Sequence, residues 1–414
     1  MNKDKGKKDR DIYGKVESPI SLVQEMYSLL SLHPGLRVYE PGVGTEVFRK
    51  YYPTDCSYSG CEIKLTCELS PEIFVGDFFD QPLDEYDLIL GNPPFRVETS
   101  IPSTSPIATK PSQKTVWSNI VKRCWDHLVD GGRLAMILPC IWLKPDKAGI
   151  YNLFTNHCIE YLRTFDATES NKLFHYNGQT PTCYVIVRKS PPNLTFKLWD
   201  KNEFIDFSLK PGCCIPTKNA KLLGEIQKRI TDPMRVIKVA SIVPSGTVVE
   251  NPTQKFPIIL GASYANQTLM FNGLEHDEPG HYQGIPKIIL AHKRLPIPYL
   301  DLAGTYGLHG RDKYVILGTT EELNVMYEFL KTPIAQTVIK SFHIRMNYYE
   351  KYIFDYMPRT IDQINDQIND QINDQINDQI NDQINDQIND QINDQINDQI
   401  NDQINDQIKN TVNI

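Results

Sequence analysis

A short apolar run that ends in two prolines constrains this chain most. Residues 86–90 (Tyr-Asp-Leu-Ile-Leu) lead through Gly91 into Asn92-Pro93-Pro94-Phe95. Such a run is typical of a buried strand in a parallel sheet. The prolines exclude continuation as helix or ladder, and Asn92 is held extended because it precedes Pro93. The chain therefore leaves the carboxyl end of a strand rigidly, where ligands bind in open α/β sheets.

The Asn-Pro-Pro-Phe segment carries groups suited to an amino-bearing ring. The Asn92 side-chain oxygen and the Pro93 carbonyl are two acceptors for one amino group, and Phe95 provides a stacking face. The alternative is a strand-ending loop whose prolines are structural. The preceding segments favour the binding interpretation.

Three earlier segments have strand ends of the same kind. A strand over residues 36–39 runs into Glu40-Pro41-Gly42-Val43-Gly44-Thr45, and a helix is expected through Val47 and Phe48. This layout brings backbone N–H groups to a nucleotide-like ligand, although a plain tight turn also explains it. A strand over 58–62 ends in Glu62, placed for ribose hydroxyls, and a third ends at Asp77-Phe78, placed for an adenine amino group and ring.

The ordered set resembles motifs I to IV of S-adenosylmethionine (AdoMet)-dependent methyltransferases, and Asn-Pro-Pro-Phe resembles motif IV of the N6-adenine DNA methyltransferases. Ser18-Pro19 resembles motif X and is expected to begin a helix with Ser18 as N-cap. The resemblance implies a Rossmann-like α/β domain with a seven-stranded, mostly parallel sheet. It also implies the cofactor-binding residues Ser18, Pro19, Glu40, Pro41, Gly42, Gly44, Glu62, Asp77, Phe78 and Asn92.

Two further features bear on this resemblance. Residues 173–178 lie between expected strands at 161–166 and 180–188 and resemble motif VIII, in which Phe174 would stack on the target base opposite Phe95. The alternative is that Phe174 belongs to the core. Glu46 stands where the family usually has a glycine, so an acid would crowd or repel the carboxylate of the cofactor.

The motif order X, I, IV and VIII, followed by a long remainder, matches the γ arrangement with target recognition at the C-terminal end. We therefore expect a methyltransferase domain over residues 16–190 and an α+β recognition domain over 191–358. Basic residues in the latter are the expected DNA contacts, the alternative being a solvated surface. These residues are Lys293, Arg294, His309 and Arg311.

The two ends of the chain differ in composition from the rest. Residues 1–15 form a basic arm that we expect to be flexible. Residues 361–408 repeat Ile-Asn-Asp-Gln, which predicts disorder, with a self-associating Ile-lined helix as the alternative. The Asp residues of the repeat account for the negative net charge of −8. The rest of the chain is therefore mildly basic, which is compatible with a nucleic-acid partner.

Several classes of protein are disfavoured. The N-terminus lacks the apolar segment of a signal peptide, and no run is long enough to span a membrane. Nine scattered cysteines without C-x-x-C spacing predict reduced thiols and no metal site. We expect a soluble intracellular protein that acts as a monomer.

The resemblance implies methyl transfer from AdoMet to the N6 amino group of adenine in double-stranded DNA. Because that atom is inaccessible in a duplex, the adenine would be flipped out. A restriction–modification or self-protection system, with a cognate restriction nuclease, is the implied setting. Three alternatives stay open: an RNA amino-group methyltransferase, a protein-glutamine methyltransferase, and a degenerate fold that binds nucleic acid.

Overall fold

The structure, a computed structural model, describes most of the chain between residues 16 and 359. The described residues are 16–52, 55–64, 67–98, 113–175, 180–239, 247–262, 268–291, 298–309, 313–342, 344 and 350–359. The expected flexible arm (1–15) and repeat tail (361–408) lie outside them. Among the described helices, none combines the length and apolar content needed to cross a membrane.

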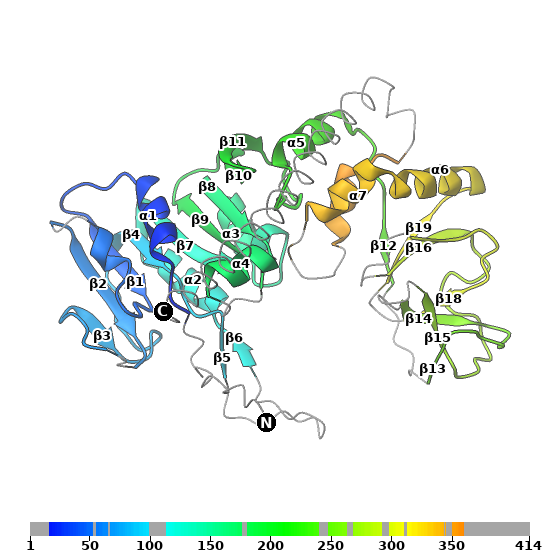
Figure 1. The fold of residues 1–414 in the computed structure, drawn as a ribbon, viewed down its shortest axis with the longest axis horizontal. Helices are drawn as coiled ribbons and strands as arrows, with labels where there is room; N and C mark the ends of the chain where they lie inside the picture. Colours follow the sequence, from blue (N-terminus) through cyan, green and yellow to red (C-terminus); the bar gives the residue numbers. More distant parts are fainter. Residues whose placement is uncertain are drawn as a thin grey trace, which may run out of the picture.

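A nine-stranded, mostly parallel sheet dominates the first half of the chain (Figure 1). Its order is β11-β10-β8-β9-β7-β4-β1-β2-β3, with antiparallel pairing at β7–β9, β8–β9 and β10–β11. The strands are β1 (Arg37–Pro41), β2 (Ser57–Glu62), β3 (Ile73–Val75), β4 (Tyr86–Gly91), β7 (Leu128–Pro139), β8 (Cys158–Phe165), β9 (Thr182–Arg188), β10 (Thr195–Asp200) and β11 (Glu203–Ser208).

The expected count of seven strands was wrong, because β10 and β11 extend the sheet. These two strands follow residue 190, where we predicted the methyltransferase domain to end. In β10, buried and half-exposed residues alternate, as in a strand with one face packed on a core. That short alternation is a weaker sequence signal than the continuous apolar runs of the central strands. The domain limits themselves remain predictions.

The sheet packs on both faces, as its central strands show. Along β7, Leu134, Met136 and Leu138 contribute to one core cluster, whereas Ala135 and Ile137 contribute to the other. The first face is covered by α2 (Trp117–Asp126) and α3 (Ile150–Thr155), and the second by α1 (Ile20–Ser28). Burial on both faces explains why these strands are apolar runs without alternation.

Two helix starts differ from expectation. The segment after Gly44 forms turns and a short 3-10 helix, η1 (Arg49–Tyr51), instead of the expected α-helix. Pro19, not Ser18, is the N-cap residue of α1, and no side chain caps this helix. The Pro19 carbonyl accepts the N–H groups of Leu22 and Val23 at 3.1 Å, so the backbone satisfies donors that Ser18 was expected to cap.

Two small four-stranded sheets occupy the C-terminal half. One has the order β12-β19-β16-β17 and the other β13-β15-β14-β18. Figure 1 shows them at one end of the molecule and β2 and β3 at the other, with α5 and α7 between. The elements are α5 (Ala220–Arg229), β12 (Ile237–Lys238), β13 (Val248–Val249), β14 (Ile258–Ala262), β15 (Leu269–Asn272), β16 (Lys287–Ala291), β17 (Tyr299–Asp301), β18 (Gly307–Leu308), β19 (Lys313–Leu317), α6 (Thr320–Lys331), α7 (Pro333–Lys340) and the 3-10 helix η3 (Lys351–Tyr356).

A buried ion pair holds the loops beside β16 and β17. Lys287 Nζ lies 2.7 Å from Asp301 Oδ2 and also donates to the carbonyls of Tyr282 and Ile285. Asp301 accepts the N–H groups of Thr305 and Tyr306. The two charged side chains are 0% and 3% exposed, so the pair is almost fully removed from water.

Candidate active site

The carboxyl ends of β1, β2, β3 and β4 meet at one edge of the sheet because these strands are parallel. The glycine loop after β1 is fastened to the end of β2. Gly42 N and Val43 N donate to the Cys61 carbonyl at 2.9 and 3.0 Å. Gly42 and Gly44 have φ angles of 81° and 59°, which glycine adopts without a steric cost. The loop is therefore held in a tight, left-handed course.

Glu62 links three of these strand ends. Its Oε2 atom accepts the Gly44 N–H at 2.7 Å, and its backbone carbonyl accepts the Gly76 N–H at 2.9 Å. The residue is 8% exposed. This position fits a carboxylate that takes ribose hydroxyls beside a glycine loop.

Glu40 lies beneath the loop instead of lining its surface. The residue is 2% exposed, and the Tyr58 hydroxyl donates to its carboxylate. Burial raises the pKa of Glu40 well above its ordinary value. The hydrogen bond from Tyr58 lowers this pKa, whereas the nearby Glu46 and Glu62 raise it further. Glu40 therefore supports the loop from within the sheet.

Glu46, which departs from the family pattern, has a left-handed backbone with a φ angle of 55°. A glycine would be free of strain there. Its carboxylate accepts the Ser70 N–H and hydroxyl at 2.9 and 2.7 Å and pairs with Arg49 at 3.0 Å. These donors satisfy the charge that we expected to repel the cofactor.

Asn92 is oriented by the segment that precedes α1. Its Nδ2 atom donates to the Val16 carbonyl at 3.1 Å. Within the described part of the chain, neither Asn92 Oδ1 nor the Pro93 carbonyl accepts a hydrogen bond. Since the amide nitrogen already donates to Val16, the side-chain oxygen is left as an acceptor, and the carbonyl of the next residue, Pro93, is a second one.

The Asn-Pro-Pro-Phe segment also touches the glycine loop. A Cβ atom added at Gly42 would lie 3.7 Å from Pro94 Cδ. Phe95 is half-buried against the core, and its carbonyl accepts the Val116 N–H at 3.2 Å. The expected cofactor loop and the expected amino-group acceptors therefore lie side by side.

The end of β3 differs in detail from the expected adenine contact. Asp77 is exposed and its Oδ1 atom accepts the Phe79 N–H at 2.9 Å. Phe78 is buried against Tyr39, whereas Phe79 is 41% exposed. Ile63, directly after Glu62, is 43% exposed. The sequence analysis missed Phe79 and Ile63, which offer apolar surface at this edge of the sheet. Each follows an acid at a strand end, Asp77 or Glu62, and that position is the signal that could have found it.

Phe174 ends α4 (Ala167–Leu173) and is 3% exposed. Its ring belongs to the core cluster that contains Phe165 and Tyr184. This burial favours the alternative in which Phe174 is a core residue. A stacking role requires the ring to move outward, and it remains a proposal.

Of the expected DNA contacts, only His309 lies within the described residues; Lys293, Arg294 and Arg311 lie outside them. The His309 ring is 5.7 Å from the His281 ring and 6.0 Å from the His276 ring. Burial is the largest cause that lowers the pKa of His309. Smaller contributions, in decreasing order, come from His281, His276 and Lys313. His309 is therefore more readily neutral than an ordinary histidine.

The residues present at this edge fit AdoMet. Two glycines in left-handed conformations, a buried Glu62 carboxylate and exposed apolar side chains match the methionine, ribose and adenine parts of that cofactor. Among the described residues, no group of three His, Cys, Asp or Glu side chains is arranged to hold a metal ion.

Comparison with known proteins points to one class. No protein-family model matches the sequence. The chain is 27% identical over 212 residues to a type II methyltransferase of Thermus thermophilus. That match covers 45% of this chain and 47% of the relative, so it spans about half of each.

Solved structures give only distant similarities. The type I restriction–modification methyltransferase subunit of Streptococcus thermophilus has a TM-score of 0.34 at 18% identity, over 49% of this chain and 52% of that one. The EcoKI M protein has a TM-score of 0.33 at 14% identity, over 44% of this chain and 48% of that one. At these scores we draw nothing further from either.

The chain has a mixed α/β fold with a large, mostly parallel sheet, and the glycine loop, the acid Glu62 and Asn-Pro-Pro-Phe lie at one edge of that sheet. Over about half of its length the chain is similar in sequence to a type II methyltransferase.

Proposed function

We propose that the protein transfers a methyl group from AdoMet to the N6 amino group of adenine in double-stranded DNA. The observation that carries this proposal is the pair of acceptors at the end of β4. Asn92 Oδ1 and the Pro93 carbonyl accept no hydrogen bond from the described residues, and they lie next to the glycine loop. An exocyclic amino group has two N–H donors to match them.

The cofactor supplies an electrophilic methyl group on a sulfonium, and the protein prepares the nucleophile. The adenine amino lone pair is delocalised into the ring. Hydrogen bonds to Asn92 and Pro93 draw the nitrogen toward tetrahedral geometry and turn its lone pair out of the ring plane. A new N–C bond forms as the C–S bond breaks, and the displaced amino proton passes to solvent. Positioning and electrostatics then supply most of the acceleration.

The base must leave the duplex to reach this site. We propose that Phe95 stacks on one face of the flipped adenine and that Phe174 moves outward to cover the other. Residues 191–358 would hold the DNA, with His309, Lys293, Arg294 and Arg311 as contacts. The proposal includes a monomeric enzyme that acts beside a cognate restriction nuclease.

Labelled methyl transfer tests the proposal. The protein is incubated with tritiated AdoMet and, separately, with unmodified genomic DNA, total RNA and a protein extract. We expect label on DNA alone. Label on RNA or protein but not on DNA would move the assignment to the corresponding alternative. No transfer, together with no AdoMet binding by calorimetry, would favour a nucleic-acid-binding module.

A further inference from the structure

A short segment before α5 lies between the catalytic sheet and the C-terminal helices. We call residues 215–219 the strap. Ile215 N donates to the Leu143 carbonyl at 2.8 Å, which fixes the start of the strap beside β7. The Thr217 carbonyl accepts the Thr164 hydroxyl of β8 at 2.7 Å. The strap is therefore fastened to β8 of the large sheet and, through Leu143, to the segment that follows β7.

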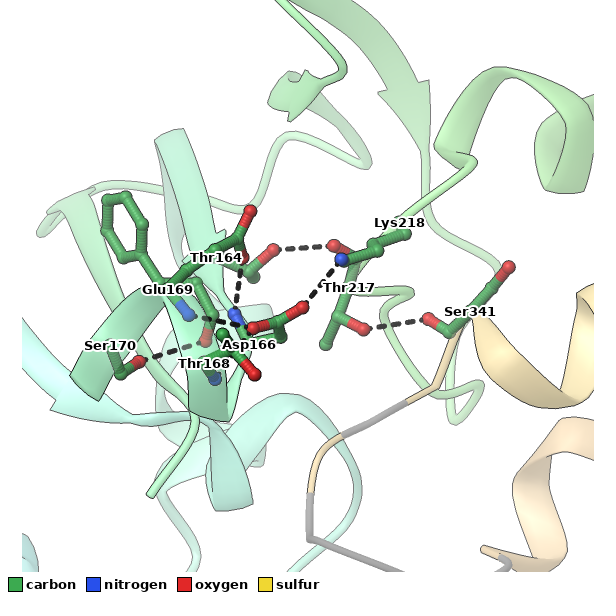
Figure 2. A network of polar contacts seen from close by, with 9 residues as sticks. Thr164, Asp166, Thr168, Glu169, Ser170, Thr217, Lys218 and Ser341 are labelled. Carbon is green, nitrogen blue, oxygen red and sulfur yellow. Dashed lines mark hydrogen bonds and ion pairs between the residues drawn. The ribbon is translucent and has the colours of Figure 1, made fainter. Parts of the chain in front are cut away.

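The other side of the strap is fastened to the end of α7. Thr217 donates its N–H and its hydroxyl to the Ser341 carbonyl, at 2.8 and 2.9 Å. Asn219 Nδ2 donates to the Ser341 hydroxyl at 2.9 Å. Ser341 is fully buried and Thr217 is 8% exposed. Figure 2 shows Thr217 between Thr164 and Ser341.

Lys218, the fourth residue of the strap, reaches Asp166, which directly precedes α4. Its Nζ atom lies 2.7 Å from Asp166 Oδ2, as Figure 2 shows. Asp166 is the N-cap of α4 and accepts the N–H groups of Thr168 and Glu169 through its other oxygen. Burial would raise the pKa of Asp166, but Lys218 and the Glu169 and Thr168 N–H groups lower it below its ordinary value, so Asp166 is a carboxylate at neutral pH.

The helix that Asp166 caps ends at Phe174. The buried Ser170 hydroxyl contacts the Thr182 hydroxyl of β9 at 2.8 Å, and the Phe174 N–H donates to the Ser170 carbonyl at 3.0 Å. This short helix therefore has a fixed middle and a capped start. The ion pair with Lys218 ties its start to the strap and through it to α7.

We propose that Lys218 is a positioning residue: through Asp166 it sets α4, and hence Phe174, for closure over the flipped base. This inference rests on the proposed function, in which Phe174 stacks on that base. It links the half of the chain expected to hold DNA to the helix expected to cover its target.

The test compares Lys218→Met with a matched control. Lys197→Met removes an ion pair of similar length (3.0 Å, to Asp206) from a lysine of similar exposure, 43% against 46% for Lys218. At saturating AdoMet, we expect kcat for methyl transfer to DNA to fall about fivefold in Lys218→Met, near the upper limit for a partly exposed ion pair. The control should match wild type, and both variants should keep wild-type Kd for AdoMet and DNA and wild-type Tm.

Two companion variants separate positioning from helix capping. Asp166→Asn keeps a good N-cap but loses the charge. It should lower kcat as much as Lys218→Met does, and the double variant should be no worse than either single one. Lys218→Arg should restore most of the activity. A wild-type kcat in Lys218→Met, or a loss explained by a lower Tm, would overturn the inference.

Phe174→Ala distinguishes failure of this inference from failure of the proposed function. We expect Phe174→Ala to lower kcat, and Lys218→Met to add little to that loss. A lower kcat in Phe174→Ala with no effect of Lys218→Met would overturn the positioning role alone. A wild-type kcat in Phe174→Ala would overturn the stacking role and the inference with it, and absence of transfer by wild type would overturn the proposed function as well.

Discussion

The carbonyl oxygen of Val16 accepts a hydrogen bond from the Asn92 side chain, although 76 positions separate the two residues. This contact brings the segment before α1 to the carboxyl end of β4. It engages the amide nitrogen and so leaves the oxygen as the acceptor that the side chain presents. In our proposal, that oxygen accepts an N–H of the target amino group.

Two N-terminal deletions test this relationship. Deleting residues 2–17 removes the Val16 carbonyl, because Met1 then takes the place of Glu17, whereas deleting residues 2–14 keeps it, and both keep Ser18 and Pro19. We expect turnover at saturating AdoMet to fall about threefold to tenfold only in the longer deletion, as for loss of one hydrogen bond. Equal turnover in the two deletions would show that the Val16 contact does not orient Asn92.

Glu62→Ala should weaken AdoMet binding about tenfold or more. The substitution removes the acceptor of the Gly44 N–H and, in our proposal, of the ribose hydroxyls. Calorimetry measures the Kd. The control is Glu68→Ala, which removes an exposed acid from the segment that follows β2. An unchanged Kd in Glu62→Ala would mean that the ribose lies elsewhere.

Glu40→Gln should change how stability depends on pH. Burial raises the pKa of Glu40 in the folded state, so the folded protein holds this proton more tightly than the unfolded chain does. Wild-type stability contributed by Glu40 is therefore present at low pH and is lost as the pH rises from about 4.5 through the folded pKa. The Tm of Glu40→Gln should rise relative to wild type over this interval. A difference in Tm that stays constant with pH would contradict this account.

Lys287→Met should destabilise the protein by about 3–5 kcal/mol because it leaves Asp301 buried without its charged partner. Urea unfolding measures the free energy. Lys331→Met breaks an exposed pair with Glu328 and should leave the free energy of unfolding nearly unchanged. If the two variants were equally stable, the buried pair would not be a major support of the loops beside β16 and β17.

Local patterns predicted the central strands and the residues at their ends. The expected strands over 86–90 and 180–188 agree with β4 and β9, because each is a continuous apolar run. Strand β10 was missed because it buries one face only. The acids Glu40 and Glu62 were placed correctly at strand ends, yet only the structure shows that one supports the loop from below and the other contacts it directly.

Contacts between distant segments left no signal in the sequence. Nothing local indicates that Ser70 donates to Glu46, or that Val16 meets Asn92. The burial of Phe174, as opposed to its position in the chain, likewise depends on how α4 packs against the sheet. Such features follow from tertiary packing, which periodicity and turn residues do not encode.

Nucleoside analysis of DNA treated with wild type and with Asn92→Ala tests the central claim most directly. We predict that wild type produces N6-methyladenine, and that Asn92→Ala lowers its formation by about 10²-fold or more, since the lost hydrogen bond strengthens as charge develops on nitrogen. Binding of AdoMet and DNA should persist in Asn92→Ala, because other residues supply that affinity. A methylated base other than N6-methyladenine, or undiminished N6-methyladenine from Asn92→Ala, would contradict the account.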